Sequence, residues 1–255
     1  MNALDIARLA GAGVAVEVVR ETGSTNADLL ARAPRLSANL MLIAERQTAG
    51  RGRAGRSWLS REGGSLTFSL AWRFNAPLHA LAGLPLAVGV ALAETLAAQG
   101  VPVQLKWPND LLKDGAKLAG VLIETQGAPD GAVWAVIGVG LNLALPDELE
   151  AQIGRPAASA PWLAGMDRDR LAAALLARLA QALGEFENAG FAVFSPRWNR
   201  LHAYAGCAVN IIDRGVVIHS GLAAGVDDSG ALLLDTAGGR VAILAGDVSL
   251  RPVEA

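Results

Sequence analysis

Short apolar runs rich in β-branched residues alternate with polar, glycine-bearing stretches through the first half of the chain. Runs of this length predict buried strands rather than helices. The expected strands cover residues 14–19, 39–44, 66–72, 103–107, 118–124 and 133–143. The last two are separated by a segment of Gly, Pro and Asp, which predicts an antiparallel hairpin with a loose turn.

Helical patterns lie between and after these strands. Ser24-Thr25-Asn26 opens a short one, and Asp167 caps a strongly periodic one that runs to about Glu187. Residues 78–98 form a long Ala- and Leu-rich stretch, broken by two glycines, a proline and a glutamate, which favours a buried helix over a membrane span. The pattern predicts an α+β fold, in which helices flank a mixed β-sheet core.

The residue composition and the length of the apolar runs change near Tyr204. Residues 146–161 are polar and dotted with proline, and from Gly206 onward brief alternating runs are broken by Gly and Asp. Brief strands of this kind are typical of a small β-barrel. We therefore expect a larger domain over residues 1–204 and a small C-terminal β domain over residues 205–255.

Charge and cysteine content narrow the function classes. Lys and Arg number 22 against 24 Asp and Glu, so a net charge of −2 creates no overall field toward nucleic acid or an anionic membrane. The single cysteine, Cys207, cannot form an internal disulfide, and the three histidines are scattered, which we interpret as structural. The first residues lack the pattern of a secretory signal, so the expected location is the cytoplasm.

Residues 45–58 join four arginines to three glycines after a predicted strand. Glycines let backbone N–H groups approach an oxyanion, and guanidinium groups supply forked donors for phosphate or carboxylate. The charges alone would equally suit a solvated basic loop or a nucleic-acid patch. The glycine spacing in a slightly acidic chain favours an anion cradle, and neither a P-loop nor a Rossmann fingerprint is present.

Lys106-Trp107-Pro108-Asn109-Asp110 places a cation and two oxygen-bearing side chains at the end of a predicted strand. Mg²⁺ beside a nucleotide needs only one or two protein ligands of this kind, although the same residues also form ordinary turns. Lys117 follows at the foot of the next strand. Taken alone it would be a solvated lysine.

Two further segments favour a ligand without requiring one. Gly138 and Gly140 lie inside the last expected strand, where glycine indicates a ligand, another backbone or tight packing close by. Ser24-Thr25-Asn26 serves as a helix cap, and a helix N-terminus also offers donors to a ligand.

These motifs follow one another in a set order. They are Ser-Thr-Asn (24–26), Gln-Thr-Ala-Gly-Arg-Gly-Arg-Ala-Gly-Arg-Ser-Trp (47–58), Lys-Trp-Pro-Asn-Asp-Leu (106–111), Lys-Leu-Ala-Gly (117–120) and Gly-Val-Gly-Leu-Asn (138–142). In this order they resemble the bacterial biotin–protein ligase family, and residues 246–251 resemble its closing strand. The resemblance implies a small SH3-like C-terminal barrel and a two-step reaction, in which ATP and biotin give biotinyl-5′-AMP and the biotin then passes to a carrier lysine.

The resemblance also implies residue roles. Arg51, Arg53 and Lys117 would be catalytic. The biotin site would hold Ser24, Thr25, Asn26, Gln47, Arg51, Gly52, Arg53 and Lys117. The nucleotide site would hold Arg53, Arg56, Trp58, Lys106, Asn109 and Asn142, and Mg²⁺ would lie at Asn109 and Asp110.

The implied partners are ATP, Mg²⁺, biotin and the biotin carboxyl carrier protein of acetyl-CoA carboxylase, and relatives suggest a homodimer. Bifunctional members begin with a helix-turn-helix domain, whereas only about thirteen residues precede the core here. We therefore expect a monofunctional ligase that binds neither DNA nor membrane. The alternatives are a lipoate–protein ligase or octanoyl transferase, and a non-catalytic protein that reads nucleic acid through the arginine loop.

Overall fold

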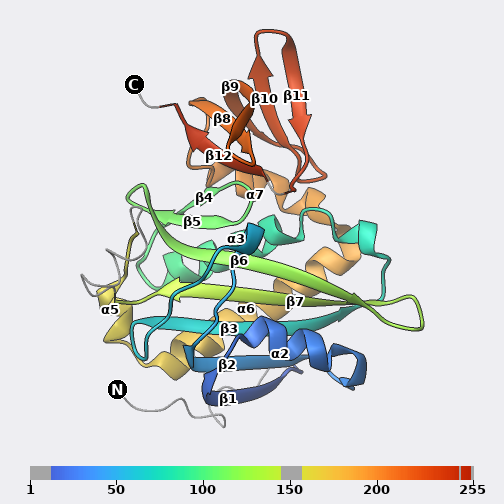
Figure 1. The fold of residues 1–255 in the computed structure, drawn as a ribbon, viewed down its shortest axis with the longest axis vertical. Helices are drawn as coiled ribbons and strands as arrows, with labels where there is room; N and C mark the ends of the chain where they lie inside the picture. Colours follow the sequence, from blue (N-terminus) through green and yellow to red (C-terminus); the bar gives the residue numbers. More distant parts are fainter. Residues whose placement is uncertain (1–12, 145–156, 247, 254–255) are drawn as a thin grey trace.

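The computed structural model describes residues 13–144, 157–246 and 248–253, and a seven-stranded sheet forms its lower body in Figure 1. The strand order is β1-β2-β3-β7-β6-β5-β4. The strands are β1 Ala15–Thr22, β2 Leu40–Gln47, β3 Ser65–Phe74, β4 Gln104–Lys106, β5 Asp110–Lys113, β6 Ala116–Gly127 and β7 Val133–Asn142. β1 pairs with β2 in parallel and the other described neighbours are antiparallel, which confirms the expected mixed sheet.

Both faces of the sheet centre are buried, because successive side chains of a strand point to opposite faces. Met41 and Ile43 of β2 join the main core, whereas Leu42 joins a second cluster with Leu29. Leu29 belongs to helix α2 (Thr25–Arg32), which covers one face, and helices α3 (Leu84–Ala98) and α6 (Arg168–Ala189) cover the other (Figure 1). The unbroken apolar runs in the sequence reflect this burial on two sides.

Two expected boundaries are wrong. The helix expected over residues 78–98 begins only at Leu84, after the 3₁₀ turn η3 (Leu78–Leu81), because Gly83 adopts a left-handed φ of +79°. A Cβ at Gly83 would lie 2.6 Å from the Phe191 ring, so the break is built into the packing. The loop expected from Glu45 starts later, since the β1–β2 pairing continues to Gln47.

The expected polar stretch 146–161 lies mostly outside the described residues. Its end forms the short helix α5 (Pro161–Ala164). By length and composition one helical stretch, Leu78–Ala98, could span a membrane, but 67% of its most apolar window is buried in this protein. Such burial is what a core helix of a globular fold requires.

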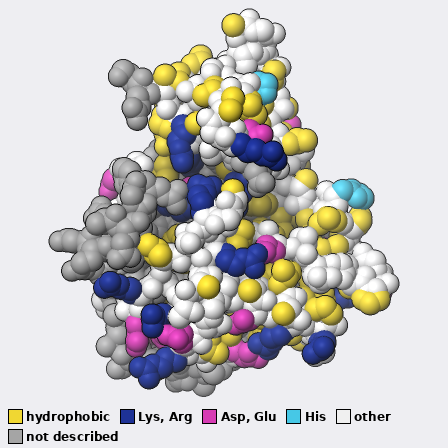
Figure 2. Space-filling model, in the orientation of Figure 1, with side chains coloured by type: hydrophobic (Ala, Val, Ile, Leu, Met, Phe, Trp, Pro, Cys, Tyr) yellow, Lys and Arg dark blue, Asp and Glu magenta, His cyan; other side chains and the backbone are white. Residues whose placement is uncertain are grey.

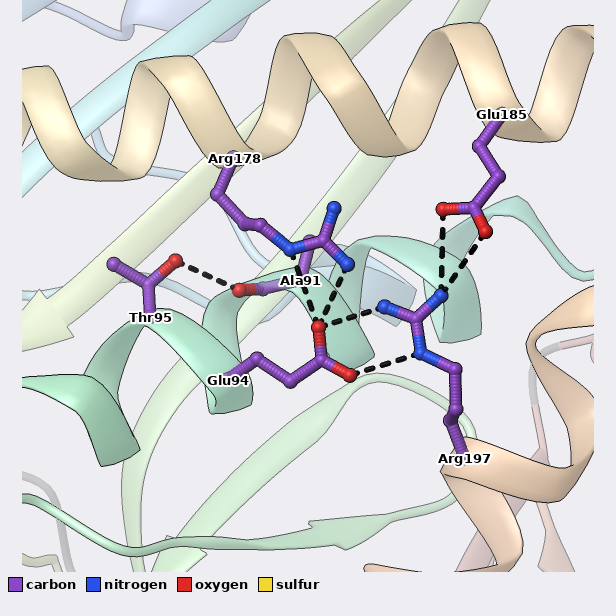
Figure 3. Close-up of polar contacts among 6 residues, drawn as sticks. All are labelled: Ala91, Glu94, Thr95, Arg178, Glu185 and Arg197. Carbon is purple, nitrogen blue, oxygen red and sulfur yellow. Dashed lines mark hydrogen bonds and ion pairs between the residues drawn. The ribbon is translucent and has the colours of Figure 1, made fainter.

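A charged cluster ties three helices together (Figure 3). Glu94 of α3 accepts hydrogen bonds from Arg178 of α6, the shorter at 2.7 Å, and from Arg197 of helix α7 (Ser195–Arg200), the shorter at 2.6 Å. Burial would raise the pKa of Glu94, but hydrogen bonds from Arg197 and Arg178 outweigh it and hold the pKa below its usual range. Arg197 also contacts Glu185 of α6 at 3.3 Å. The cluster therefore fixes α7 on the larger body.

A second sheet of five antiparallel strands follows α7, at the top of Figure 1. Its strands are β8 Ala208–Asp213, β9 Val216–Val226, β10 Leu232–Thr236, β11 Gly239–Ile243 and β12 Val248–Pro252, in the order β11-β10-β9-β8-β12. Among the described residues no pairing joins β11 to β12. The brief strands are as expected for an SH3-like domain, but the expected barrel is not closed.

The small sheet is held to the larger body at the end of β9 and at the turn that follows it. Asn199 of α7 exchanges two hydrogen bonds with the backbone of Val226, at 2.8 and 3.0 Å. Trp107 Nε1 donates to the carbonyl of Gly230 at 3.2 Å. The segment that carries Asn109 and Asp110 thus contacts the C-terminal domain directly through Trp107.

We expect His202 to make folding stability sensitive to mild acid. It is 5% exposed, its ring packs 4.7 Å from that of Trp198, and burial lowers its pKa to about 4. Protonation is therefore easier in the unfolded chain, so stability falls as pH drops below 6.5 toward 4. Between pH 7 and pH 5 this single group should cost about 2 kcal/mol of unfolding free energy.

Urea unfolding of wild type and His202→Gln at both pH values measures this. The variant should lose about 2 kcal/mol less than wild type on acidification. His219→Gln is the matched control, because His219 is exposed on β9. Equal pH dependence in wild type and His202→Gln would contradict the assignment.

Candidate active site

One pocket over the middle strands of the sheet gathers residues from all five sequence motifs. Its walls come from the N-terminus of α2, the end of β2, the arginine-rich loop, the centre of β3, the turn into β5, the first half of β6 and the second half of β7. The lining residues are Ser24, Thr25, Asn26, Gln47, Arg51, Gly52, Arg53, Arg56, Ser57, Trp58, Thr67, Phe68, Ser69, Asn109, Asp110, Lys117, Gly120, Val121, Leu122, Gly138, Val139 and Gly140. Two predicted site residues, Lys106 and Asn142, are not among them.

Buried polar side chains joined by hydrogen bonds form the floor of the pocket. They are Thr25, Asn26, Gln47 and Ser69. The backbone N–H of Thr25 donates to Gln47 Oε1 at 2.8 Å, and Thr25 Oγ1 lies 2.7 Å from Ser69 Oγ. Ser69 Oγ donates to Asn26 Oδ1 at 2.6 Å, and Asn26 Nδ2 donates to Glu124 Oε2 at 3.0 Å. All of these except Glu124 are buried, so their hydrogen bonds have no competition from water and their geometry is well defined.

The two glycines of β7 make room for this floor and for a tryptophan. A Cβ at Gly138 would lie 2.3 Å from Asn26 Oδ1, and one at Gly140 would lie 2.3 Å from Cε2 of the Trp58 ring. Close side-chain packing therefore explains both glycines. The sequence left open whether a ligand, a backbone or packing lay there.

The arginine-rich loop forms a small closed turn over the pocket. Gly52 N donates to Arg56 O at 2.6 Å, and an isolated bridge pairs Arg51 with Ser57. Arg56 Nε donates to the carbonyl of Arg53 at 3.2 Å, which keeps Arg56 within the loop. The loop therefore presents its arginines from one compact unit, consistent with the anion cradle expected from its sequence.

Arg53 joins three parts of the protein. Its guanidinium donates to Asn109 Oδ1 at 3.0 Å and, from Nη2, to the backbone carbonyl of Gly246 just before β12. It is also 3.5 Å from the carbonyl of Val248. The loop is thus connected both to the Asn109-Asp110 turn and to the C-terminal sheet.

Lys117 is held beside the loop. Its Nζ lies 2.5 Å from Asp110 Oδ1 and 5.9 Å from the centre of the Trp58 ring. The two charged side chains are 17% and 16% exposed, so the pair is sheltered but not sealed from solvent. An incoming anion can therefore reach Lys117 from the pocket side.

The two predicted residues outside the lining have supporting contacts. Asn142 Nδ2 donates to the carbonyls of Ala158 at 3.1 Å and Lys117 at 3.4 Å, which ties β7 to the backbone on either side. Lys106 Nζ lies 6.0 Å from the centre of the Tyr204 ring. Asn142 thus contacts the backbone of the pocket residue Lys117, whereas Lys106 faces a ring that does not line the pocket.

Three polar residues at the site were not predicted from the sequence. Thr67 and Ser69 line the pocket from β3, and Glu124 of β6 accepts from Asn26. Thr67 and Ser69 alternate with apolar residues in the strand, and that period of two was a usable signal. Glu124 had no comparable signal, because it is 98 residues from Asn26.

Oxygen donors suitable for a cation are few. No group of three His, Cys, Asp or Glu side chains with metal-binding geometry occurs in the described part of the chain. Asp110 and Asn109 each offer an oxygen at the pocket, facing Lys117 and Arg53 respectively. This set fits Mg²⁺ only when a ligand's phosphate oxygens complete the shell.

The surface charge supports a local anion site. Figure 2 shows Lys and Arg side chains gathered between the C-terminal sheet and the larger sheet, while the rest of this face mixes both signs. A nucleic-acid interface would extend a basic stripe across the face. The face in view carries no such stripe.

Comparisons with known proteins agree with the motifs. Residues 15–142 match the model of the biotin/lipoate A/B protein ligase family, and residues 205–251 match the biotin protein ligase C-terminal domain. The bifunctional ligase/repressor BirA of Escherichia coli is 37% identical over 95% of this chain and 76% of its own length. The biotin–[acetyl-CoA-carboxylase] ligase of Mycobacterium tuberculosis is 37% identical over 94% of this chain and 92% of its own.

A solved structure extends the likeness to the fold. Biotin protein ligase from Aquifex aeolicus, in complex with biotin and ATP, superposes with a TM-score of 0.78 and 30% identity, over 93% of this chain and 99% of that one. The match includes both sheets, since it spans nearly the whole of each chain. The chain therefore belongs to the biotin/lipoate A/B protein ligase family and carries the C-terminal domain of its biotin protein ligases.

Proposed function

We propose that this chain is an ATP-dependent biotin–protein ligase. The carboxylate of biotin attacks the α-phosphorus of ATP, forming biotinyl-5′-AMP and releasing pyrophosphate. The amine of a carrier lysine then attacks the acyl carbon, forming an amide and releasing AMP. The observation that carries this proposal is the polarity of the pocket floor beside a cluster of fixed cations.

The floor has the hydrogen-bond polarity that a ureido group needs. Asn26 Oδ1 can only accept, so the single hydroxyl proton of Ser69 is committed to it. The one hydroxyl proton of Thr25 faces two acceptors, Ser69 Oγ at 2.7 Å and Gln47 Oε1 at 3.1 Å, and is used within the protein. Both hydroxyls then present lone pairs to a ligand N–H. Ser24 Oγ accepts from the N–H of Ala27, which leaves its proton for a ligand carbonyl.

The positively charged side chains in the pocket suit the carboxylate end of biotin, where the reaction takes place. Biotin's carboxylate and the triphosphate repel each other, so fixed positive charge must offset that repulsion and stabilise the charge developing at phosphorus. Lys117 and Arg53 line the same pocket as the polar floor, with Arg51, Gly52 and Arg56 in the loop above. We assign Lys117, Arg53 and Arg51 to the catalytic role and Gln47 to the biotin end.

We assign the nucleotide to the side of the pocket bounded by Trp58, Arg56 and Asn109. Trp58 offers a ring face, and the arginines offer forked donors to phosphate. Asn142 and Lys106 support this side from outside the lining. Mg²⁺, held by Asp110 and Asn109 together with phosphate oxygens, would supply Lewis-acid stabilisation.

The pairing proposal rests on the free edge of β6. Beyond Gly120, β6 pairs only with β7 among the described strands, so residues 123–127 present an open strand edge. Open edges pair readily with other strands. We propose that two copies of the chain pair through this edge. The carrier, a biotin carboxyl carrier protein, would instead present its lysine at the mouth of the pocket. We also propose that the catalytic and C-terminal domains divide at residues 204 and 205.

One incubation tests the function. Purified protein is given ATP and Mg²⁺ with either biotin or lipoate, and acyl-AMP and labelling of a biotin carrier domain are measured. Biotinyl-AMP and a biotinylated carrier are expected, with no lipoyl product. Lipoyl-AMP would instead select the lipoate ligase reading, and no acyl-AMP from either acid would overturn the proposal.

Arg53→Ala is expected to shorten the retention of biotinyl-AMP and to slow its formation by about a hundredfold, since it removes a fixed cation from the acyl-phosphate. It also removes the link to Asn109 and Gly246. Release of labelled adenylate from a rapidly filtered complex measures retention. Arg46→Ala is the control, because Arg46 pairs with Glu21 at the surface. Unchanged retention in Arg53→Ala would contradict the role.

A further inference from the structure

We propose that Glu124 is a positioning residue that sets the orientation of the Asn26 amide and anchors the arginine-rich loop through Arg51. The inference rests on the proposed biotin site. Glu124 is outside the pocket lining, so it would act through the two side chains that it holds.

The Glu124 carboxylate determines which atom of the Asn26 amide faces it. An ionised carboxylate only accepts hydrogen bonds, so the Asn26 atom that faces Glu124 Oε2 at 3.0 Å must be the amide nitrogen. The second N–H of that nitrogen faces the carbonyl of Leu122 at 3.4 Å. Both donors of Asn26 are therefore directed toward β6, away from the pocket.

This orientation fixes the polarity of the floor. With the nitrogen turned toward Glu124, Asn26 Oδ1 faces Ser69 and draws the Ser69 proton. Ser69 Oγ is then an acceptor for Thr25, whose hydroxyl faces it and Gln47 Oε1. If the amide were reversed, its NH₂ group would face Ser69, and the floor would offer donors where a ureido N–H needs acceptors. One carboxylate beyond the lining thus selects the state that accepts a ligand's N–H groups.

The second oxygen of Glu124 reaches the loop. Arg51 Nη2 pairs with Glu124 Oε1, and the two side chains are 47% and 20% exposed. This ion pair joins the loop to β6 next to Asn26. The carboxylate therefore connects loop closure with the hydrogen-bond polarity of the floor.

Glu124→Gln tests the idea with the smallest possible change. Its carboxamide keeps the shape but replaces one acceptor oxygen by a donor, so either Asn26 or Arg51 then faces an NH₂ group. The dissociation constant for biotin, measured by calorimetry without ATP, should rise about tenfold to a hundredfold, the effect of losing a charge-assisted hydrogen bond. The KM for ATP at saturating biotin should change less than the dissociation constant for biotin, because Glu124 reaches the nucleotide side only through the Arg51 anchor of the loop.

Three further variants separate positioning from general damage. Glu124→Asp retains the charge and should recover part of the lost affinity. Glu17→Gln is the matched control, since Glu17 forms a carboxylate–guanidinium pair with Arg32 at the surface, and it should bind biotin like wild type. In an Asn26→Ala background, Glu124→Gln should cost at most about threefold, because its main target is gone.

The outcomes are distinguishable. If wild type binds no biotin, the proposed function fails. If wild type binds biotin and Glu124→Gln binds it equally well, the function stands and the positioning role is refuted. The role is also refuted if Glu124→Gln weakens biotin and ATP equally with a lowered Tm, or if its full effect persists with Asn26→Ala.

Discussion

Lys117→Ala is expected to slow the formation of biotinyl-5′-AMP by about a thousandfold, since one fixed charge aimed at the transition state is commonly worth 10²–10³ in rate. Lys117 is held on β6 by Asp110 at 2.5 Å and is mostly sheltered from solvent. Its charge therefore acts in a setting where water screens it poorly. The substitution also removes the ion pair between Lys117 and Asp110.

Pyrophosphate release in a single turnover measures this step. Lys117→Arg should recover part of the rate, because it keeps the charge but changes the position of the donors. Lys113→Ala is the control, since Lys113 lies on β5, outside the pocket, near Asp114 and the Trp162 ring. A rate within tenfold of wild type in Lys117→Ala would remove Lys117 from the catalytic role.

Much of the fold could be predicted because its strands are buried on both faces. The run from Leu40 to Ala44 has no polar side, and the structure places Met41 and Leu42 in different clusters on opposite faces. Where the predicted element boundaries were wrong, contacts between residues far apart in the sequence had set the actual boundary. Gly83 breaks the expected helix because Phe191 packs against it, and no local pattern reports a contact between residues 108 positions apart.

Many of the site residues could be predicted from the sequence, but the hydrogen bonds between them could not. Glycine and arginine spacing indicated the loop over residues 45–58, and every one of the predicted site residues except Lys106 and Asn142 lines one pocket. The network that orients them was hidden, because hydrogen bonds such as Asn26 to Glu124 and Arg53 to Gly246 join segments 98 and 193 residues apart. Sequence patterns identify groups that carry chemistry, whereas the folded chain determines which of them hold one another in place.

Gly138→Ala is expected to weaken biotin binding at least about a hundredfold while the protein still folds, with a loss of about 1–3 kcal/mol of unfolding free energy from overpacking. The added Cβ would lie 2.3 Å from Asn26 Oδ1 and 2.9 Å from its Cγ. Asn26 is held by Ser69, Leu122 and Glu124, so it cannot yield by a small rotation. The amide must leave its position, and the polarity of the pocket floor is lost with it.

Calorimetry with biotin and urea unfolding together measure both effects. Gly127→Ala is the matched control, because Gly127 belongs to β6 and a Cβ there meets nothing within 4 Å. Combining Gly138→Ala with Asn26→Ala removes the clash, so it should restore stability but not biotin affinity. That split would place the lost affinity in the amide of Asn26 rather than in a damaged sheet. If Gly138→Ala alone bound biotin as tightly as wild type, Asn26 would have no part in recognising the ligand.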